Sequence, residues 1–183
     1  MNKSYIFLAD GFEEIEGLTV VDLLRRAGVE ITMVSIMGKK NITGAHKITL
    51  EADALFEECD FSDGDMFVLP GGMPGTRYLG AHKGLTELLK KADQEKKGIA
   101  AICAAPSVLG ELGLLKGKHA VCYPGFEEKL TGAVTSTEPV VTDGNITTSR
   151  GMGTAISFAL ELITRMCSRE KAEELAKGII YQA

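Results

Sequence analysis

The chain has 183 residues, of which 45% are hydrophobic, 25% charged and 6% aromatic, and its net charge is −5. This length fits one domain, over residues 1–183, with a sizeable buried core. An acidic chain without a cluster of Lys and Arg among aromatic residues is not typical of a protein that binds nucleic acid or anionic membranes. Its longest uncharged stretch, residues 98–110, is shorter than the ~20 residues that span a bilayer. We therefore expect neither nucleic acid nor membrane as a partner.

The four cysteines also exclude some classes of protein. Positions 59, 103, 122 and 167 show neither the spacing of a metal site nor that of a secreted disulfide framework. Residues 1–4 lead directly into a strand-like segment, which leaves no room for a signal peptide. We expect a cytoplasmic protein with reduced thiols, and no metal or other cofactor.

Short apolar runs alternate with longer amphipathic segments from one end of the chain to the other. Residues 5–9 predict a buried parallel strand, and residues 14–27 predict an amphipathic helix. Gly28 follows in the position that glycine favours after a helix. The helical spacing predicts an inward face formed by Ile15, Leu18, Val21, Leu24 and Ala27.

The same alternation continues through the rest of the chain. Further strands are predicted at residues 30–36, 66–69, 98–102 and 120–122, with a hairpin or edge excursion at 42–52. Further helices are predicted at residues 83–96, 104–112, 125–130, 154–166 and 169–180, the last one capped by Ser168. An Asp-Gly turn at residues 143–144 predicts a second hairpin. This order predicts a mostly parallel sheet with helices on both faces.

Cys103 is the strongest candidate for a reactive residue. It lies between a buried strand and the start of a helix, among the small residues of segment 100–106, as at the nucleophile elbow of α/β hydrolases. A helix N-terminus lowers the pKa of a thiol, and the adjacent N–H groups can hold an oxyanion. The alternative is that Cys103 is a small apolar core residue, the most common role of a free cysteine.

Two further segments follow predicted strands and should lie near Cys103, because parallel sheets bind ligands at the carboxyl ends of their strands. The glycines of residues 69–75 allow a close approach of the backbone to an anion, although a plain turn also explains them. In the acidic run that follows the first strand, we expect Glu13 or Glu14 to cap the helix or to interact with its dipole. Glu16 can lean toward the thiol with a raised pKa and exchange a proton with a substrate.

Five sequence blocks together resemble the ThiJ/PfpI superfamily, the group that contains the Parkinson-disease protein deglycase. The blocks are residues 9–16 (ADGFEEIE), 22–28 (DLLRRAG), 68–72 (VLPGG), 100–106 (AAICAAP) and 148–154 (TSRGMGT). The resemblance implies a flavodoxin-like three-layer α/β/α sandwich of the class I glutamine-amidotransferase type, usually a homodimer. It also implies that Cys103 is the reactive thiol and Glu16 its protonated partner, with Gly72 and Ala104 supplying oxyanion N–H groups.

Some positions depart from the family pattern. Ala104 stands where protease-like members have a histidine, which argues against peptidase activity. Tyr123 stands where the deglycase branch often has a histidine, and tyrosine is a poor base near neutral pH. His46 replaces a common arginine, whereas Arg26 matches a family arginine that lines an anion site. The resemblance thus leaves Arg26, Gly71 and Tyr123 as possible substrate or anion contacts.

We therefore predict a cysteine-dependent enzyme that acts on a small dicarbonyl or glycated substrate without glutathione. In this glyoxalase or protein deglycase, Cys103 forms a hemithioacetal and Glu16 moves a proton. The alternative is a redox-sensing or chaperone-like stress-response protein with an oxidisable Cys103. A cysteine hydrolase or peptidase is disfavoured because no histidine base follows the cysteine, and a binding domain with inert thiols also stays open.

Overall fold

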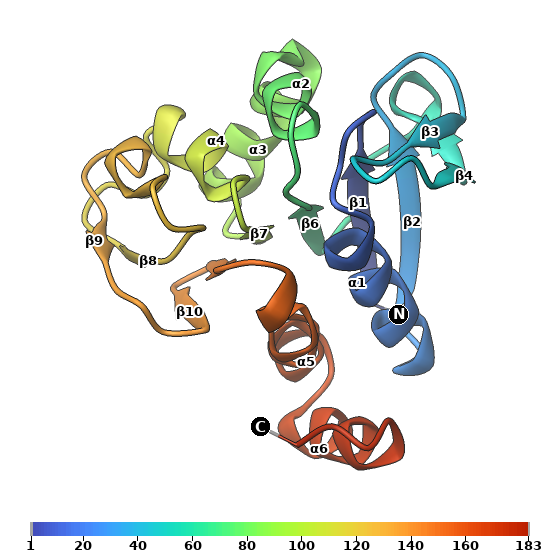
Figure 1. Cartoon of the computed structure of the whole chain (residues 1–183), viewed down its shortest axis with the longest axis vertical. Helices are drawn as coiled ribbons and strands as arrows, with labels where there is room; N and C mark the ends of the chain where they lie inside the picture. Colours follow the sequence, from blue (N-terminus) through green and yellow to red (C-terminus); the bar gives the residue numbers. More distant parts are fainter. Residues whose placement is uncertain (1, 183) are drawn as a thin grey trace.

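A sheet of seven strands runs through the middle of the computed structural model, which describes residues 2–182. Its strand order is β10-β11-β7-β6-β1-β2-β5 (Figure 1). The bounds are β1 Lys3–Leu8, β2 Glu30–Ser35, β5 Ala54–Leu55, β6 Met66–Leu69, β7 Gly98–Ile102, β10 Val140–Asp143 and β11 Ile146–Ser149. Every neighbouring pair is parallel except β10 and β11, which form the predicted hairpin around Gly144. The predicted, mostly parallel sheet is confirmed.

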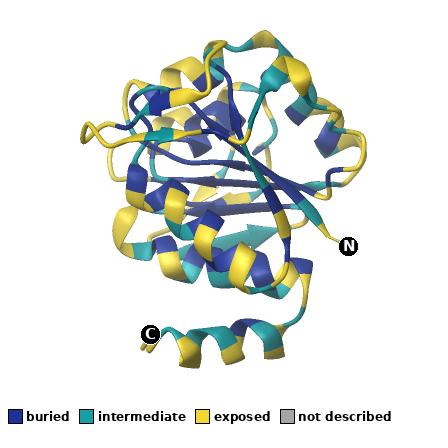
Figure 2. Cartoon of the chain, turned by 90° about the vertical axis from the view of Figure 1, so that its right-hand side faces the viewer, coloured by how far each residue is buried: buried dark blue, intermediate teal, exposed yellow. Residues whose placement is uncertain are grey.

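Helices cover both faces of this sheet. On one side lie α1 (Glu14–Arg26), α5 (Ala155–Met166) and α6 (Arg169–Gly178), and on the other α2 (Gly75–Ala81), α3 (Lys83–Gln94) and α4 (Pro106–Glu111). Because successive side chains of a strand point to opposite faces, Ile6 and Phe7 belong to two different apolar cores. Figure 2 shows the buried strands as a layer between helices whose outer faces are exposed. The fold is the expected flavodoxin-like α/β fold.

Two small sheets lie outside the main one. Strands β3 (Asn41–Thr43) and β4 (Thr49–Glu51) form an antiparallel hairpin, as predicted for residues 42–52. Strands β8 (His119–Ala120) and β9 (Val134–Thr135) pair in parallel. Short 3-10 helices span Phe56–Glu58, Glu127–Lys129 and Met152–Thr154. The strand predicted at 120–122 and the helix predicted at 125–130 are therefore both shorter than expected.

Several helices differ from the prediction, most of them by one or two residues at an end. Helix α2 was not predicted, because its two glycines weaken the helical signal and it directly follows a Pro-Gly-rich loop. Helix α4 begins at Pro106 rather than at residue 104, since proline suits the first helical turn and the two preceding alanines belong to the turn after β7. Helix α6 ends at Gly178, two residues early, and Ser168 caps its start by accepting a hydrogen bond from the Lys171 N–H.

The inward face of α1 was predicted only in part: Val21 and Leu24 are buried as expected, but two other residues of the predicted face are not. Ile15 is 50% exposed and Leu18 is 37% exposed, whereas Glu14 and Glu16 are buried. Apolar residues occur all around this helix, so their spacing does not select one face. The two carboxylates decide the orientation, because backbone N–H groups of neighbouring loops donate hydrogen bonds to both of them. The helix ends as predicted, with Gly28 at a positive φ.

Candidate functional site

Cys103 occupies the turn between β7 and α4, at the carboxyl end of the sheet. Its φ is 67°, in the left-handed region that residues other than glycine rarely adopt. Two hydrogen bonds hold this conformation: the Cys103 N–H donates to the Ser149 carbonyl at 3.0 Å, and the Tyr123 N–H donates to the Cys103 carbonyl at 2.8 Å. The residue is half-buried. The predicted elbow is therefore present.

Glu16 faces this thiol from the first turn of α1. Its side chain is buried, with the residue only 1% exposed, and its Oε2 accepts a hydrogen bond from the Gly71 N–H at 3.0 Å. The carboxyl also lies within hydrogen-bonding reach of the Cys103 sulfur. Gly71 fits between the two groups because it has no Cβ, which would come within 2.5 Å of both Cys103 Cβ and Glu16 Oε2.

Backbone N–H groups from two loops converge on the sulfur. Those of Gly72 and Ala104 are placed to donate to a Cys103 thiolate, and both favour the ionised form. The loop that carries Gly72 is tied to the start of α1, since the Glu13 N–H donates to the Gly71 carbonyl at 2.9 Å. Five of the predicted site residues thus lie together in the structure: Cys103, Glu16, Gly71, Gly72 and Ala104.

The two ionisable groups of the site compete for protons. Burial and the Glu16 carboxylate raise the pKa of Cys103 to about 12, against the lowering effect of the backbone N–H groups. Burial likewise raises the pKa of Glu16 to about 7. The predicted lowering of the Cys103 pKa by a helix N-terminus was therefore wrong in direction, because α4 starts three residues later and burial outweighs its effect. Titrating as a pair, the groups release a first proton near pH 7.

Tyr123 and Arg26 lie at different distances from this pair. The Tyr123 ring is half exposed and packs against Gly151, whose backbone also lies close to the Glu16 carboxyl, so Tyr123 borders the mouth of the site. Arg26 is ten residues beyond Glu16 on α1, about 15 Å along the helix axis, and so does not reach the thiol in this chain. Its Nε donates instead to Asp22 at 2.9 Å.

Neither Glu13 nor Glu14 caps α1 with its side chain, although Glu14 lies in the first turn, as expected for a carboxylate that interacts with the helix dipole. The buried Glu14 turns instead toward the β3–β4 hairpin, where its Oε1 accepts hydrogen bonds from the N–H groups of His46 at 2.8 Å and Ile48 at 3.3 Å. Sequence reasoning missed this cluster because its two parts are 32 residues apart. Only the small hairpin brings them together.

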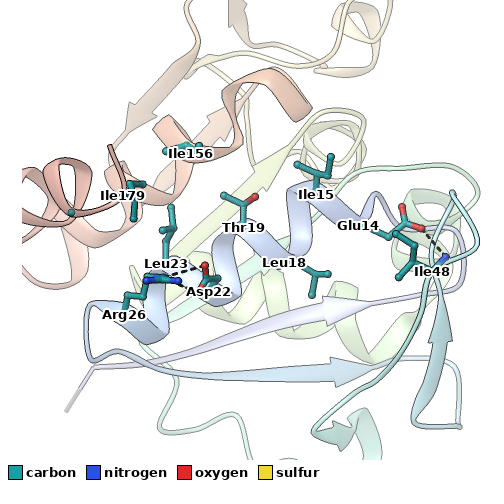
Figure 3. A pocket seen from close by; sticks show the side chains of 11 residues that line it. Glu14, Ile15, Leu18, Thr19, Asp22, Leu23, Arg26, Ile48, Ile156 and Ile179 are labelled. Carbon is teal, nitrogen blue, oxygen red and sulfur yellow. Dashed lines mark hydrogen bonds and ion pairs between the residues drawn. The ribbon is translucent and has the colours of Figure 1, made fainter. Parts of the chain in front are cut away.

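A hollow lies elsewhere, along the outer side of α1 (Figure 3). Its volume is about 650 Å³. Lining residues include Ile15, Leu18, Thr19, Asp22, Leu23, Arg26, Ile48, Ile156 and Ile179. Apolar side chains therefore form much of its wall, with the Arg26–Asp22 ion pair at one end. In residues 2–182, no helix is long and apolar enough to cross a membrane.

The fold and the site together define the class of protein. The sheet is flavodoxin-like, a cysteine occupies the turn after β7, and a buried carboxyl faces its thiol. The model of the DJ-1/PfpI family matches residues 2–165, and the chain belongs to this family. It is 39% identical over 182 residues to Protein DJ-1 homolog B of Arabidopsis thaliana, matching 98% of this chain but 42% of that protein. The chain thus spans less than half the length of this relative.

Two other comparisons cover nearly the whole of both proteins. A deglycase of Pyrococcus abyssi is 33% identical over 160 residues, which are 86% of this chain and 95% of that protein. The structure of oxidized Toxoplasma gondii DJ-1 superposes with a TM-score of 0.96 at 34% identity, covering 100% of both chains. The family resemblance seen in the sequence is therefore confirmed.

Proposed function

We propose that the protein is a cysteine-dependent enzyme that converts small α-dicarbonyls, or glycated groups derived from them, without glutathione. The observation that carries this proposal is the buried Glu16 carboxyl beside the Cys103 thiol, with its pKa raised by burial to about 7. A group with this pKa both accepts and donates protons near neutral pH. The similarity to a protein named as a deglycase supports the same chemistry.

With methylglyoxal as substrate, the reaction starts from the form of the pair in which Glu16 holds the proton. The Cys103 thiolate adds to the aldehyde carbon, a C–S bond forms, and the carbonyl oxygen takes the Glu16 proton to give a hemithioacetal. The N–H groups of Gly72 and Ala104 stabilise the negative charge that develops on this oxygen.

The Glu16 carboxylate then removes the hydrogen on the sulfur-bearing carbon as a proton and returns it to the neighbouring carbon. The hydroxyl proton on the first oxygen passes to the oxygen of that neighbouring carbon. The product of this transfer is a thioester of lactic acid on Cys103. Water hydrolyses the thioester, releasing lactate and the free thiol, so that methylglyoxal plus water gives lactic acid. In this proposal Tyr123 donates a hydrogen bond to the second carbonyl oxygen.

Turnover of methylglyoxal to lactate tests this proposal. Cys103→Ala is expected to abolish lactate formation, and Glu16→Gln is expected to allow thiol addition but no proton transfer between the carbons. Cys59→Ala is the matched control, because Cys59 is also half-buried but hydrogen-bonds the Leu55 carbonyl away from the site. Lactate formation that persists in Cys103→Ala, or its absence in the unmodified protein, overturns the proposal.

A redox function of the same thiol is the second candidate. The oxidized state named for the similar Toxoplasma gondii structure favours it, as does the half-buried thiol of Cys103. A protonated Glu16 can donate a hydrogen bond to a sulfinate on Cys103 and so slow its further oxidation. After mild peroxide treatment, intact mass should show a two-oxygen adduct that is absent from Cys103→Ser. Uniform oxidation of all four cysteines argues against this function.

We further propose that the chain forms a homodimer through the outer face of α1. Ile15, Leu18, Ile48 and Ile156 are exposed there around the hollow of Figure 3, and an apolar patch of this kind is typical of a protein interface. Sedimentation of the unmodified protein should give a dimer, and Ile15→Glu together with Leu18→Glu should give a folded monomer. A monomeric unmodified protein at micromolar concentration contradicts this assembly.

A further inference from the structure

A second cluster of ionisable side chains lies where the β3–β4 hairpin meets the start of α1. Glu13, Glu14 and His46 each offer one ligand atom, and these atoms all lie within 4.8 Å of one another. His46 Nδ1 is 3.1 Å from Glu14 Oε2 and 3.4 Å from Glu13 Oε2. The mechanism proposed for Cys103 and Glu16 uses none of these three side chains.

Glu14 is oriented toward this cluster by its surroundings. Its Oε1 accepts the N–H groups of His46 and Ile48, whereas Oε2 contacts only the His46 ring among the described residues. A Cβ on Gly44 would overlap the Glu14 carboxyl, so the loop has room for the carboxyl only because a glycine stands there. Backbone donors that fix one oxygen and leave the other toward its neighbours are the kind of support that orients metal ligands.

The distances from His46 Nδ1 to the two carboxylates fit a bound metal ion. In a tetrahedral zinc site with bonds of about 2.0 Å, neighbouring ligand atoms are about 3.3 Å apart. The two distances from His46 Nδ1 lie on either side of this value. One imidazole nitrogen with two carboxylate oxygens is also a donor set that suits first-row divalent cations. The His46 side chain is 69% exposed, which leaves space for water as a further ligand.

We propose that Glu13, Glu14 and His46 form a binding site for a divalent first-row cation such as Zn²⁺, with water completing the coordination. The two carboxylates supply two negative charges that balance the ion. Binding requires the Nδ1 lone pair, so the ion displaces the proton from His46. The site ties the hairpin to the residues just before Glu16, and it does not depend on the function proposed for Cys103.

Acid weakens zinc binding at this site. A metal ion binds the unprotonated Nδ1 of His46, so a proton on this atom competes with zinc. The carboxylates of Glu13 and Glu14 are the ionisable groups that face the ring in the described structure. The affinity should therefore fall as the pH is lowered.

Calorimetric titration of the metal-free full chain with ZnCl₂ tests the site. The unmodified protein should bind one zinc ion per chain, with affinity reduced at least tenfold in His46→Asn and in Glu13→Gln. The His46 side chain is 69% exposed, and glutamine keeps the size and shape of the 15% exposed Glu13 side chain, so the fold should persist in both variants. The buried Glu14 holds the hairpin and is left unchanged. Cys103→Ser is the matched control, because a thiol is itself a zinc ligand.

The same variants give a second readout in the melting temperature. Zinc should raise the melting temperature of the unmodified protein and of Cys103→Ser, but not that of His46→Asn. Equal zinc affinity in His46→Asn and in the unmodified protein overturns the proposal, as does binding that is lost only in Cys103→Ser. An absence of binding at millimolar zinc shows that the cluster is an ordinary ion pair and also overturns it.

Discussion

Replacing Glu16 with glutamine is expected to make the stability of the protein less dependent on pH between 5 and 8. Burial raises the pKa of this carboxyl from 4.5 to about 7. The native state therefore carries more protons than the unfolded state between these two values, and its stability falls as the pH rises through them. The stability that protonated Glu16 contributes is fully present below pH 4.5 and is lost as the pH passes 7.

The magnitude follows from the difference between the two pKa values. Moving a carboxyl pKa from 4.5 to about 7 corresponds to about 3 kcal/mol, because each tenfold change in proton affinity is worth about 1.4 kcal/mol. Of this amount, about 2.5 kcal/mol falls between pH 5 and pH 8. A glutamine of similar shape does not titrate. The stability of Glu16→Gln relative to the unmodified protein should therefore rise by this amount from pH 5 to pH 8.

Urea denaturation of both proteins at pH 5 and pH 8 measures this difference. Comparing the two proteins at each pH removes the contributions of the ionisable groups that do not interact with Glu16, provided that the slope against urea concentration is the same. We expect Glu16→Gln to gain about 2.5 kcal/mol on the unmodified protein between the two pH values. A gain below about 0.5 kcal/mol, or a change of opposite sign, refutes the idea that burial governs this carboxyl.

Three further substitutions test the packing and hydrogen bonds around the site. Gly71→Ala should slow Cys103 alkylation at least tenfold and cost about 1–3 kcal/mol in urea denaturation, because the new Cβ meets both Cys103 and Glu16; unchanged values contradict this. Thr148→Val should cost about 1–3 kcal/mol, since Oγ1 is the acceptor of the buried Val121 N–H, and a neutral result would exclude that role. Ser168→Ala should cost about 1 kcal/mol through loss of the α6 cap, whereas a stability equal to the unmodified protein argues against the cap.

The sheet could be predicted because its central strands are continuous apolar runs. Strands β6 and β7 lie within a residue of their predicted bounds, as expected for segments buried on both faces. Helix α2 and the inward face of α1 could not be predicted in this way. Helix α2 lacks a helical spacing of apolar residues. Helix α1 is oriented by buried carboxylates whose hydrogen-bond partners come close only in the folded chain.

The same division applies to the site. Cys103, Glu16 and Gly72 could be placed together from sequence because each follows the carboxyl end of a predicted parallel strand. The direction in which the Cys103 pKa shifts could not be predicted, since it depends on burial and on how closely the carboxyl approaches the sulfur. The contact between Glu14 and His46 likewise depends on the exact position of a short hairpin.

The rate of iodoacetamide labelling at each cysteine, followed from pH 5 to pH 10 by mass spectrometry, tests the central claim most directly. If Cys103 and Glu16 share one proton above pH 7, part of the population carries a thiolate facing a carboxylic acid. Labelling of Cys103 should then rise with an apparent pKa near 7, while Cys59, whose pKa burial raises, reacts only at higher pH. A Cys103 rate that rises only above pH 9, no faster than that of Cys59, contradicts the account.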